Sequence, residues 1–299
     1  MAEKNIRKRL ERLVAPYRVT DGRGFRLDRR DPADTRGIEK DHAEAYLEKG
    51  IEYLASAQER LYANDQWGLL LIFQAMDAAG KDGAIKHVMS GVNPQGCQVF
   101  SFKAPSAKEL DHDFLWRTTC CLPERGRIGI FNRSYYEEVL VVRVHPEFLG
   151  AQRLPAGLVS KHIWKERCED ISNFERYLAR QGYAIVKFFL HVSKDEQKKR
   201  FLERLDRPDK NWKFSSADVA ERAHWDAYMK AYEDAIRRTA AGHAPWYVVP
   251  ADHKWFARLV VAGAIAGTLD RLNLDFPVVD DEAKQTLEAA RRALIRERG

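Results

Sequence analysis

The sequence has few cysteines, and their spacing gives no sign of a disulfide framework. Its four cysteines are Cys97, Cys120, Cys121 and Cys168; two are adjacent and none forms a C-x-x-C motif. Neighbouring cysteines rarely bridge each other, so we expect reduced, mostly buried thiols. The first residues, Met-Ala-Glu-Lys-Asn, contain no apolar core of a signal peptide. Both observations predict a cytoplasmic protein.

Long hydrophobic runs and common catalytic or metal-binding spacings are also lacking. The longest late apolar run, at 259–269, is too short to span a bilayer and includes Gly263 and Gly267. The nine histidines show no metal-ligand spacing, and no Gly-x-Ser-x-Gly elbow is present. No repeat or low-complexity tract occurs. We therefore expect no membrane partner, and neither a histidine metal centre nor a serine hydrolase.

What the chain does have is a large apolar content and a moderate positive charge. It contains 299 residues, 45% of them hydrophobic, with seven Trp and fourteen Phe. This composition predicts one large α/β domain or two smaller ones with a sizeable core. The net charge of +6 suggests a polyanionic partner, either nucleic acid or a phosphate-rich small molecule, although a charged soluble surface explains it as well. Aromatic residues are not interleaved with a basic stripe, so we expect no nucleic-acid partner.

Apolar strand patterns alternate with helical patterns along most of the chain. Such alternation predicts a parallel sheet covered on both faces. Ligands of open α/β sheets bind beyond the carboxyl ends of the strands, and Asp77, Arg133 and His191 follow such ends. The predicted strands are the run from Leu69, then 97–102, 126–131, 184–191 and 246–249. The predicted helices are 41–61, 81–89, 106–118, 135–144, 158–181, 193–205, 217–241, 255–272 and one charged helix after Pro277.

The first strand leads into an imperfect phosphate-binding loop. Compared with the pattern G-x-x-x-x-G-K-[ST], Ala75 holds the first glycine position and Asp82 replaces the Ser or Thr. A cation such as Lys81 is mildly unfavourable at a helix N-terminus, so a lysine there requires a reason. Asp77 would repel phosphate unless Mg²⁺ stood between them. An ordinary buried strand and tight turn, with Asp77 in an Asx contact, remains the alternative.

Two further segments fit phosphoryl transfer. The strand at 126–131 delivers Arg133 to the sheet's carboxyl edge, where a guanidinium can stabilise a transferring phosphoryl group. Ser134, with Glu137 three residues on, is also a sufficient helix N-cap. The loop at 206–216 joins basic residues to Trp212, which suits a lid over phosphates, although a solvated loop explains it too.

Taken together, these segments resemble the polyphosphate kinase 2 family. The resemblance covers about residues 45–275, and the single phosphate loop is similar to a single-domain member. Gln74, Ala75, Asp82 and Asn132 look like the subgroup that acts on both nucleoside mono- and diphosphates. The matching segments are Met76–Gly83, Ser90–Gly96, Ile128–Glu137 and Arg207–Lys213.

The resemblance implies a P-loop kinase-like three-layer α/β/α fold with a parallel sheet, a helical lid and helical N- and C-terminal extensions. It divides the chain into an N-terminal arm and helix (1–67), a catalytic domain (68–275, lid about 206–241) and a C-terminal helix (276–299). The implied activity is phosphoryl transfer between inorganic polyphosphate and AMP or ADP, with GMP and GDP as further acceptors. The implied cofactor is Mg²⁺, and the implied assembly is a homo-oligomer, either a dimer or a tetramer.

The resemblance also assigns roles to individual residues. Asp77 would hold Mg²⁺ and act in catalysis with Lys81 and Arg133. Phosphate and polyphosphate would be bound by Ala78, Ala79, Gly80, Asp82, Gly83, Lys86, Lys103, Arg207 and Lys210. The nucleotide would be bound by Asn93, Asn132, Tyr136 and Glu137. The competing interpretations are an ATP-dependent nucleoside-monophosphate kinase of the thymidylate-kinase type and a non-catalytic polyanion- or RNA-binding protein.

Overall fold

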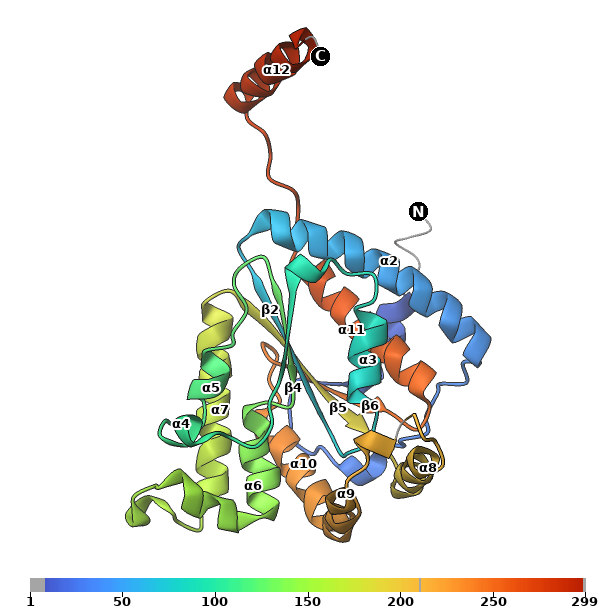
Figure 1. Ribbon diagram of the computed structural model, residues 1–299, viewed down its shortest axis with the longest axis vertical. Helices are drawn as coiled ribbons and strands as arrows, with labels where there is room; N and C mark the ends of the chain where they lie inside the picture. The colour runs from blue at the N-terminus through green and yellow to red at the C-terminus, as the bar shows by residue number, and fades with distance from the viewer. Residues whose placement is uncertain (1–8, 210, 298–299) are drawn as a thin grey trace.

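A six-stranded sheet forms the centre of the molecule (Figure 1). The computed structural model describes residues 9–209 and 211–297. The strand order is β1-β6-β5-β2-β4-β3, in which all neighbouring pairs are parallel except β1 with β6. The strands are β1 (Arg18–Val19), β2 (Gly68–Ala75), β3 (Cys97–Ser101), β4 (Ile128–Asn132), β5 (Tyr183–His191) and β6 (Trp246–Pro250). The predicted α/β class is confirmed, with one antiparallel edge strand that was too short to be recognised.

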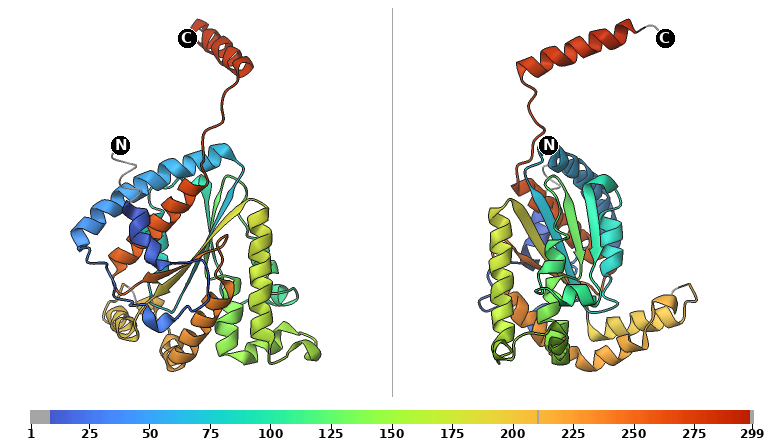
Figure 2. Two further views of the ribbon diagram at one scale, coloured as in Figure 1. Left: turned by 180° about the vertical axis from the view of Figure 1, so that it is seen from behind. Right: turned by 60° about the vertical axis from the view of Figure 1, so that its left-hand side comes forward.

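Helices cover both faces of this sheet (Figures 1 and 2). Helices α2, α3 and α11 pack together on one face, and α6, α7 and α10 on the other. The α-helices are α2 (Lys40–Asn64), α3 (Lys81–Val88), α4 (Ala107–Leu110), α5 (Trp116–Thr119), α6 (Val141–Val144), α7 (Ile163–Arg180), α8 (Lys194–Leu205), α9 (Ser216–Glu221), α10 (Trp225–Thr239), α11 (Lys254–Arg271) and α12 (Asp281–Arg296). The 3-10 helices are η1 (Ala15–Tyr17), η2 (Leu27–Arg29), η3 (Pro94–Gly96), η4 (Tyr135–Val139), η5 (Pro146–Gln152), η6 (Ala156–Leu158), η7 (Asn211–Lys213) and η8 (Arg222–His224).

Burial on both faces explains why the central strands read as continuous apolar runs. Every residue of β2 except Ala75 is buried, and so is β5 from Ile185 to His191. Parallel strands covered on both sides need apolar side chains at successive positions rather than at alternate ones. The late apolar run at 259–269 is likewise explained, because it lies inside α11, whose residues from Leu259 to Ala266 are all buried.

Three predicted helices are interrupted in the structure. The predicted helix at 106–118 begins with the expected capping box between Ser106 and Glu109, but it splits into α4 and α5. Between them, Asp113 Oδ1 accepts a hydrogen bond from the backbone N–H of Leu115, a local bond that competes with helix formation. The segment at 135–144 divides into η4 and α6, and the segment at 217–241 divides into α9, η8 and α10.

The carboxyl ends of β2, β4 and β5 meet at one edge of the sheet, and two segments extend away from the body. Helices α8 and α9 form an arm beside that edge (Figure 2). Helix α12 stands apart at the end of an extended connection (Figures 1 and 2).

Among residues 9–209 and 211–297, no helix combines the length and the hydropathy needed to cross a membrane.

Candidate active site

The loop after β2 has the backbone geometry of a phosphate-binding loop. β2 ends at Ala75 and α3 begins at Lys81. Gly80 has φ 106°, in the region that favours glycine, and Ala78 has φ 61°, which a residue with a side chain rarely adopts. The first N–H groups of α3 have no carbonyl partners within the helix, so they are available to an anion. The strand–loop–helix arrangement expected from the sequence is confirmed.

Helix α8 holds this loop from its buried side. Arg200 NH1 donates to the carbonyl oxygens of Ala78 at 3.1 Å and of Ala79 at 2.8 Å. Gln197 Nε2 donates to the carbonyl of Asp77 at 2.9 Å. Arg200 and Gln197 are 3% and 1% exposed, so these bonds are shielded from water. Sequence analysis missed both residues; their i, i+3 spacing on one helix face was the available signal.

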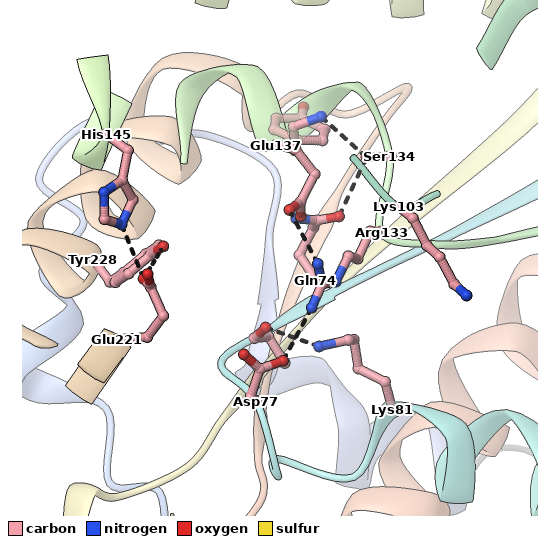
Figure 3. Close-up of polar contacts among 12 residues, drawn as sticks. Gln74, Asp77, Lys81, Lys103, Arg133, Ser134, Glu137, His145, Glu221 and Tyr228 are labelled. Carbon is pink, nitrogen blue, oxygen red and sulfur yellow. Dashed lines mark hydrogen bonds and ion pairs between the residues drawn. The ribbon is translucent and has the colours of Figure 1, made fainter. Parts of the chain in front are cut away.

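Asp77, Lys81 and Arg133 come together at the carboxyl edge of the sheet (Figure 3). Arg133 NH2 donates to Asp77 Oδ1 at 3.0 Å. The pairing of β2 with β4 produces this approach, because Phe73 lies opposite Asn132 and the residues that follow each strand become neighbours. Lys81 Nζ turns back over the loop and donates to the carbonyl of Ala75 at 2.9 Å.

Burial and mutual charge set the electrostatics of this group. Burial lowers the pKa of Lys81, and the neighbouring carboxylate of Asp77 opposes the shift. Burial also acts against the charge of Arg133, but Glu137 and Asp77 outweigh it and raise the pKa of Arg133 above its usual value. Two cations thus share a partly desolvated space with acidic groups, and a bound phosphate would complete the charge balance.

Glu137 faces the same space and is held from β2. Gln74 Nε2 donates to Glu137 Oε1 at 2.7 Å, and Arg133 NH1 lies 4.0 Å from Glu137 Oε2. Ser134 caps η4 as expected, because its Oγ accepts from the backbone N–H of Tyr136 at 3.1 Å. Ser134 therefore has the predicted role of an N-cap. The cap does not explain Glu137, because its carboxylate is held by Gln74 of β2.

The acidic residue in the last position of the loop pattern contacts the end of β4. Asn132 Nδ2 donates to Asp82 Oδ1 at 2.8 Å. Asp82, which stands where the phosphate-loop pattern has Ser or Thr, is therefore a direct partner of Asn132. This contact ties the N-terminus of α3 to the strand that carries Arg133.

Tyr136 was predicted to bind the nucleotide, and its side-chain position corrects that prediction. It is fully buried, and its hydroxyl donates to Glu175 Oε1 at 2.9 Å beneath η4. Tyr136 and its neighbour Tyr135 both point into the core, whereas Glu137 faces the site. His191, at the end of β5, is also buried, with Nε2 3.2 Å from the carbonyl oxygen of Arg30.

The remaining predicted contacts lie on the surface around this centre. Lys86 and Lys103 are exposed. Asn93 Oδ1 accepts from the backbone N–H of Gln95 and so caps η3, which is a structural role. Arg207 pairs with Asp209 at 2.9 Å on the arm. Lys210 lies outside the described residues.

The arm brings one carboxylate near the site that sequence analysis did not single out. Asp218 on α9 lies 3.9 Å from Arg204. Burial raises the pKa of Asp218, and the negative charge of Asp77 raises it further. Another contact joins α9 to the body, because Glu221 Oε2 accepts from the hydroxyl of Tyr228 at 2.7 Å and lies 3.0 Å from His145 Nε2 (Figure 3).

The chain offers few protein ligands to a metal ion. Within the part of the chain that the structure describes, no group of three or more His, Cys, Asp or Glu side chains could hold one. Asp77 is 34% exposed and gives one oxygen to Arg133. This donor set fits Mg²⁺, which binds through one or two carboxylates, waters and substrate phosphates rather than in an all-protein cage.

Comparisons with known proteins agree with this geometry. The family model described as polyphosphate kinase 2 matches residues 37–277. The chain is 55% identical over 258 residues to an ADP-polyphosphate phosphotransferase of Rhodopseudomonas palustris, covering 86% of this chain and 89% of that protein. It is 46% identical to an AMP/ADP-polyphosphate phosphotransferase of Meiothermus ruber, covering 87% and 94%. The crystal structure of polyphosphate kinase 2 from Arthrobacter aurescens superposes with a TM-score of 0.83 at 43% identity, covering 93% and 94% of the two chains.

Proposed function

Because the chain belongs to the polyphosphate kinase 2 family, we infer that it is a phosphotransferase that moves a phosphoryl group between inorganic polyphosphate and a nucleotide. The observation that carries this conclusion for the present chain is the meeting of Asp77, Lys81 and Arg133 at the mouth of a phosphate loop. Phosphoryl transfer needs positioning and positive charge rather than covalent chemistry, and this site supplies both.

We propose the following division of work. A terminal phosphate oxygen of the nucleotide is already ionised at neutral pH, so it attacks the terminal phosphorus of polyphosphate without a general base. The bond between that phosphorus and the bridging oxygen breaks, and the shortened polyphosphate leaves. Lys81 and Arg133 stabilise the charge that spreads over the transferring group. The N–H groups of residues 78–83 bind phosphate oxygens.

Asp77 is the residue that would hold Mg²⁺. When bound, the ion would supply additional positive charge to the phosphate groups. The partly exposed carboxylate of Asp77, which follows the strand that leads into the phosphate loop, supports this proposal. Arg133 keeps that carboxylate in one orientation through the 3.0 Å bond to Oδ1.

We propose that both AMP and ADP are acceptors, with GMP and GDP as further candidates. The names of the two relatives differ on this point, since one specifies ADP and the other AMP and ADP. The Asn132–Asp82 contact supports the proposal, because it joins two residues by which this chain resembles the subgroup that uses both.

We also propose that the part of the chain after α8, within the predicted lid at about 206–241, closes over the bound phosphates, while α8 keeps its buried bonds to the phosphate loop. The charges of Arg204 and Asp218, and the proximity of Asp218 to Asp77, support a functional link between arm and site. Within this proposal, residues 68–275 form the catalytic domain. Residues 1–67 form an N-terminal arm, distinct from the arm of α8 and α9, and a helix packed on the domain. Residues 276–299 form a separate C-terminal helix. Within the same proposal, Arg207 and Lys210 bind polyphosphate.

Self-association and location are proposals as well. Helix α12 lies beyond the residues that the family model matches, and Leu287 and Leu294 on it are 60% and 66% exposed. We propose that this helix contributes to a dimer or tetramer. Light scattering on the full chain and on its Leu287→Lys/Leu294→Lys variant tests this proposal. We expect a lower molecular mass for the variant. All four cysteines are free, which supports a cytoplasmic location. Only Cys168 is buried, so the prediction of mostly buried thiols was wrong.

The decisive experiment omits ATP. Incubation of AMP or ADP with polyphosphate and Mg²⁺ should produce ADP or ATP, measured by chromatography. An ATP-dependent nucleoside-monophosphate kinase of the thymidylate-kinase type would produce nothing under these conditions. Absence of product from both acceptors would therefore reject the proposed function.

A further inference from the structure

A closed network of buried polar groups lies directly beneath η4. The hydroxyls of Tyr135 and Tyr136 both donate to Glu175 Oε1, at 3.0 and 2.9 Å. Lys187 Nζ donates to Glu175 Oε2 at 2.6 Å, to the hydroxyl of Tyr136 at 3.0 Å and to the carbonyl oxygen of Thr239 at 2.8 Å. All of these side chains are 2% exposed or less. All three protons of the ammonium group are used, so the network is complete.

Stability alone is a weak explanation for such a network. Removing two charges from water costs several kcal/mol per ion, and apolar side chains of similar volume often replace a buried ion pair without loss of stability (roughly neutral to 1–4 kcal/mol more stable). Burial lowers the pKa of Lys187, and the negative charge of Glu175 raises it. The loss of solvation and the ion pair therefore act on the ammonium group in opposite directions. A buried pair of this kind is better explained by what it holds in place.

The network holds the turn that carries the reacting groups. Tyr135 and Tyr136 lie between Arg133 and Glu137 in the sequence, so both hydroxyl bonds fix the middle of the segment whose ends face the site. Arg133 has φ 65°, a conformation that costs a residue with a side chain on the order of 1–2 kcal/mol. Such a conformation persists only when surrounding contacts impose it.

The turn is held from two sides. From β2, the carbonyl of Phe73 accepts the N–H of Arg133 at 3.0 Å, and Gln74 donates to Glu137 at 2.7 Å. From below, Glu175 on α7 and Lys187 on β5 hold the tyrosine hydroxyls. Lys187 pairs with Ile72 of β2 in the sheet register, so the network is anchored to the same strand that leads into the phosphate loop. Both sets of contacts therefore fix the position of Arg133 relative to β2.

We propose that the Lys187–Glu175 pair is a positioning device for phosphoryl transfer. Through the hydroxyls of Tyr135 and Tyr136 it fixes the turn at Arg133, and so the placement of the guanidinium relative to Asp77 and the transferring phosphoryl group. Neither Lys187 nor Glu175 contacts substrate in this proposal. The inference rests on the proposed function and adds these four residues to the machinery of that site.

The test removes one hydroxyl while keeping the aromatic ring. In Tyr135→Phe, Glu175 retains the bonds from Tyr136 and Lys187, so the chain should stay folded. We expect kcat for ADP phosphorylation by polyphosphate to fall about tenfold or more, because misplacement by about 1 Å can cost 10²-fold, while KM for ADP changes less than about twofold. Tyr136→Phe serves as a second variant if the first is poorly folded.

Tyr53→Phe is the matched control. Tyr53 is 7% exposed, and its hydroxyl donates to Asp270 Oδ1 at 2.5 Å, between α2 and α11 on the other face of the sheet. Tyr53→Phe loses a tyrosine–carboxylate hydrogen bond that is partly buried, without touching η4. We expect a similar decrease in Tm for Tyr53→Phe and Tyr135→Phe, but a decrease in kcat only for Tyr135→Phe.

A double-mutant cycle identifies the residue through which Tyr135 acts. If Tyr135 positions Arg133, then Tyr135→Phe combined with Arg133→Lys should lower kcat little more than Arg133→Lys alone, since residues that act as a unit are not additive. An unchanged kcat in folded Tyr135→Phe, or strictly additive effects in the cycle, would overturn the inference while leaving the proposed function intact. If the unsubstituted chain has no polyphosphate-dependent activity, the proposed function fails and the inference fails with it.

Discussion

Replacing Arg133 with glycine should separate activity from stability. Arg133 has φ 65°, so glycine relieves strain of about 1–2 kcal/mol at this position. Against this gain, glycine adds about 0.5–1 kcal/mol of conformational freedom to the unfolded chain. The ion pair with Asp77, whose side chains are 40% and 34% exposed, contributes about 0.2–1 kcal/mol. These terms nearly cancel, so we expect the free energy of unfolding to change by about 1 kcal/mol at most.

Activity should respond very differently. Arg133→Gly removes a positive charge aimed at the transferring phosphoryl group, and loss of one such group costs on the order of 10²–10³ in kcat. The assay follows ATP formation from ADP and polyphosphate, alongside thermal unfolding of the same preparation. With about 2–4 °C of Tm per kcal/mol, Tm should stay within a few degrees of that of the unsubstituted chain.

Arg153 provides a control with the same local features. It has φ 52° and forms an ion pair with Asp111 on the surface near η5. Arg153→Gly should therefore change Tm in the same way as Arg133→Gly and leave kcat unchanged. The reasoning would be refuted if Arg133→Gly kept near-normal kcat, or if its loss of activity followed a large decrease in Tm.

Four other predictions concern the phosphate loop and its charges. Asp77→Asn should abolish phosphoryl transfer while the circular dichroism spectrum is unchanged; retained transfer would remove Asp77 as the metal-holding residue. Arg133→Lys keeps the charge but loses the planar fork, so kcat should fall about tenfold or more, and near-normal turnover would make Arg133 only structural. Arg200→Lys should lower kcat/KM about tenfold, since lysine lacks the fork that bonds several carbonyls; a change in Tm alone would limit Arg200 to a role in folding. Burial lowers the pKa of Lys81, and the protonated form is the one that neutralises phosphate. The value of kcat/KM should therefore fall as pH rises through that lowered pKa. If the same fall at alkaline pH persists in an active Lys81→Arg variant, another group is responsible for it.

The sequence determined the strand–loop–helix unit and the identity of its charged residues. Apolar runs buried on both faces have a pattern that is visible without the fold, and Lys81 follows such a run at a short, fixed spacing. The same holds for Arg133, which comes directly after a buried strand. Residues that follow neighbouring parallel strands must meet at one edge, so Asp77 and Arg133 could be brought together from the sequence.

Only the tertiary structure decided which polar residues are buried and what they hold. Lys187 and Glu175 look like surface residues in a charged sequence, and their role depends on partners such as Tyr136 and Thr239, which are distant along the chain. Arg200 acts on carbonyls 121 and 122 positions away. Local patterns report the period of a helix or strand, whereas the cost of burying a charge is offset only by the particular groups that the fold places around it. For that reason the sequence identified the charged groups that meet at the carboxyl edge of the sheet, and the fold revealed the buried polar groups that contact the loop and turn carrying them.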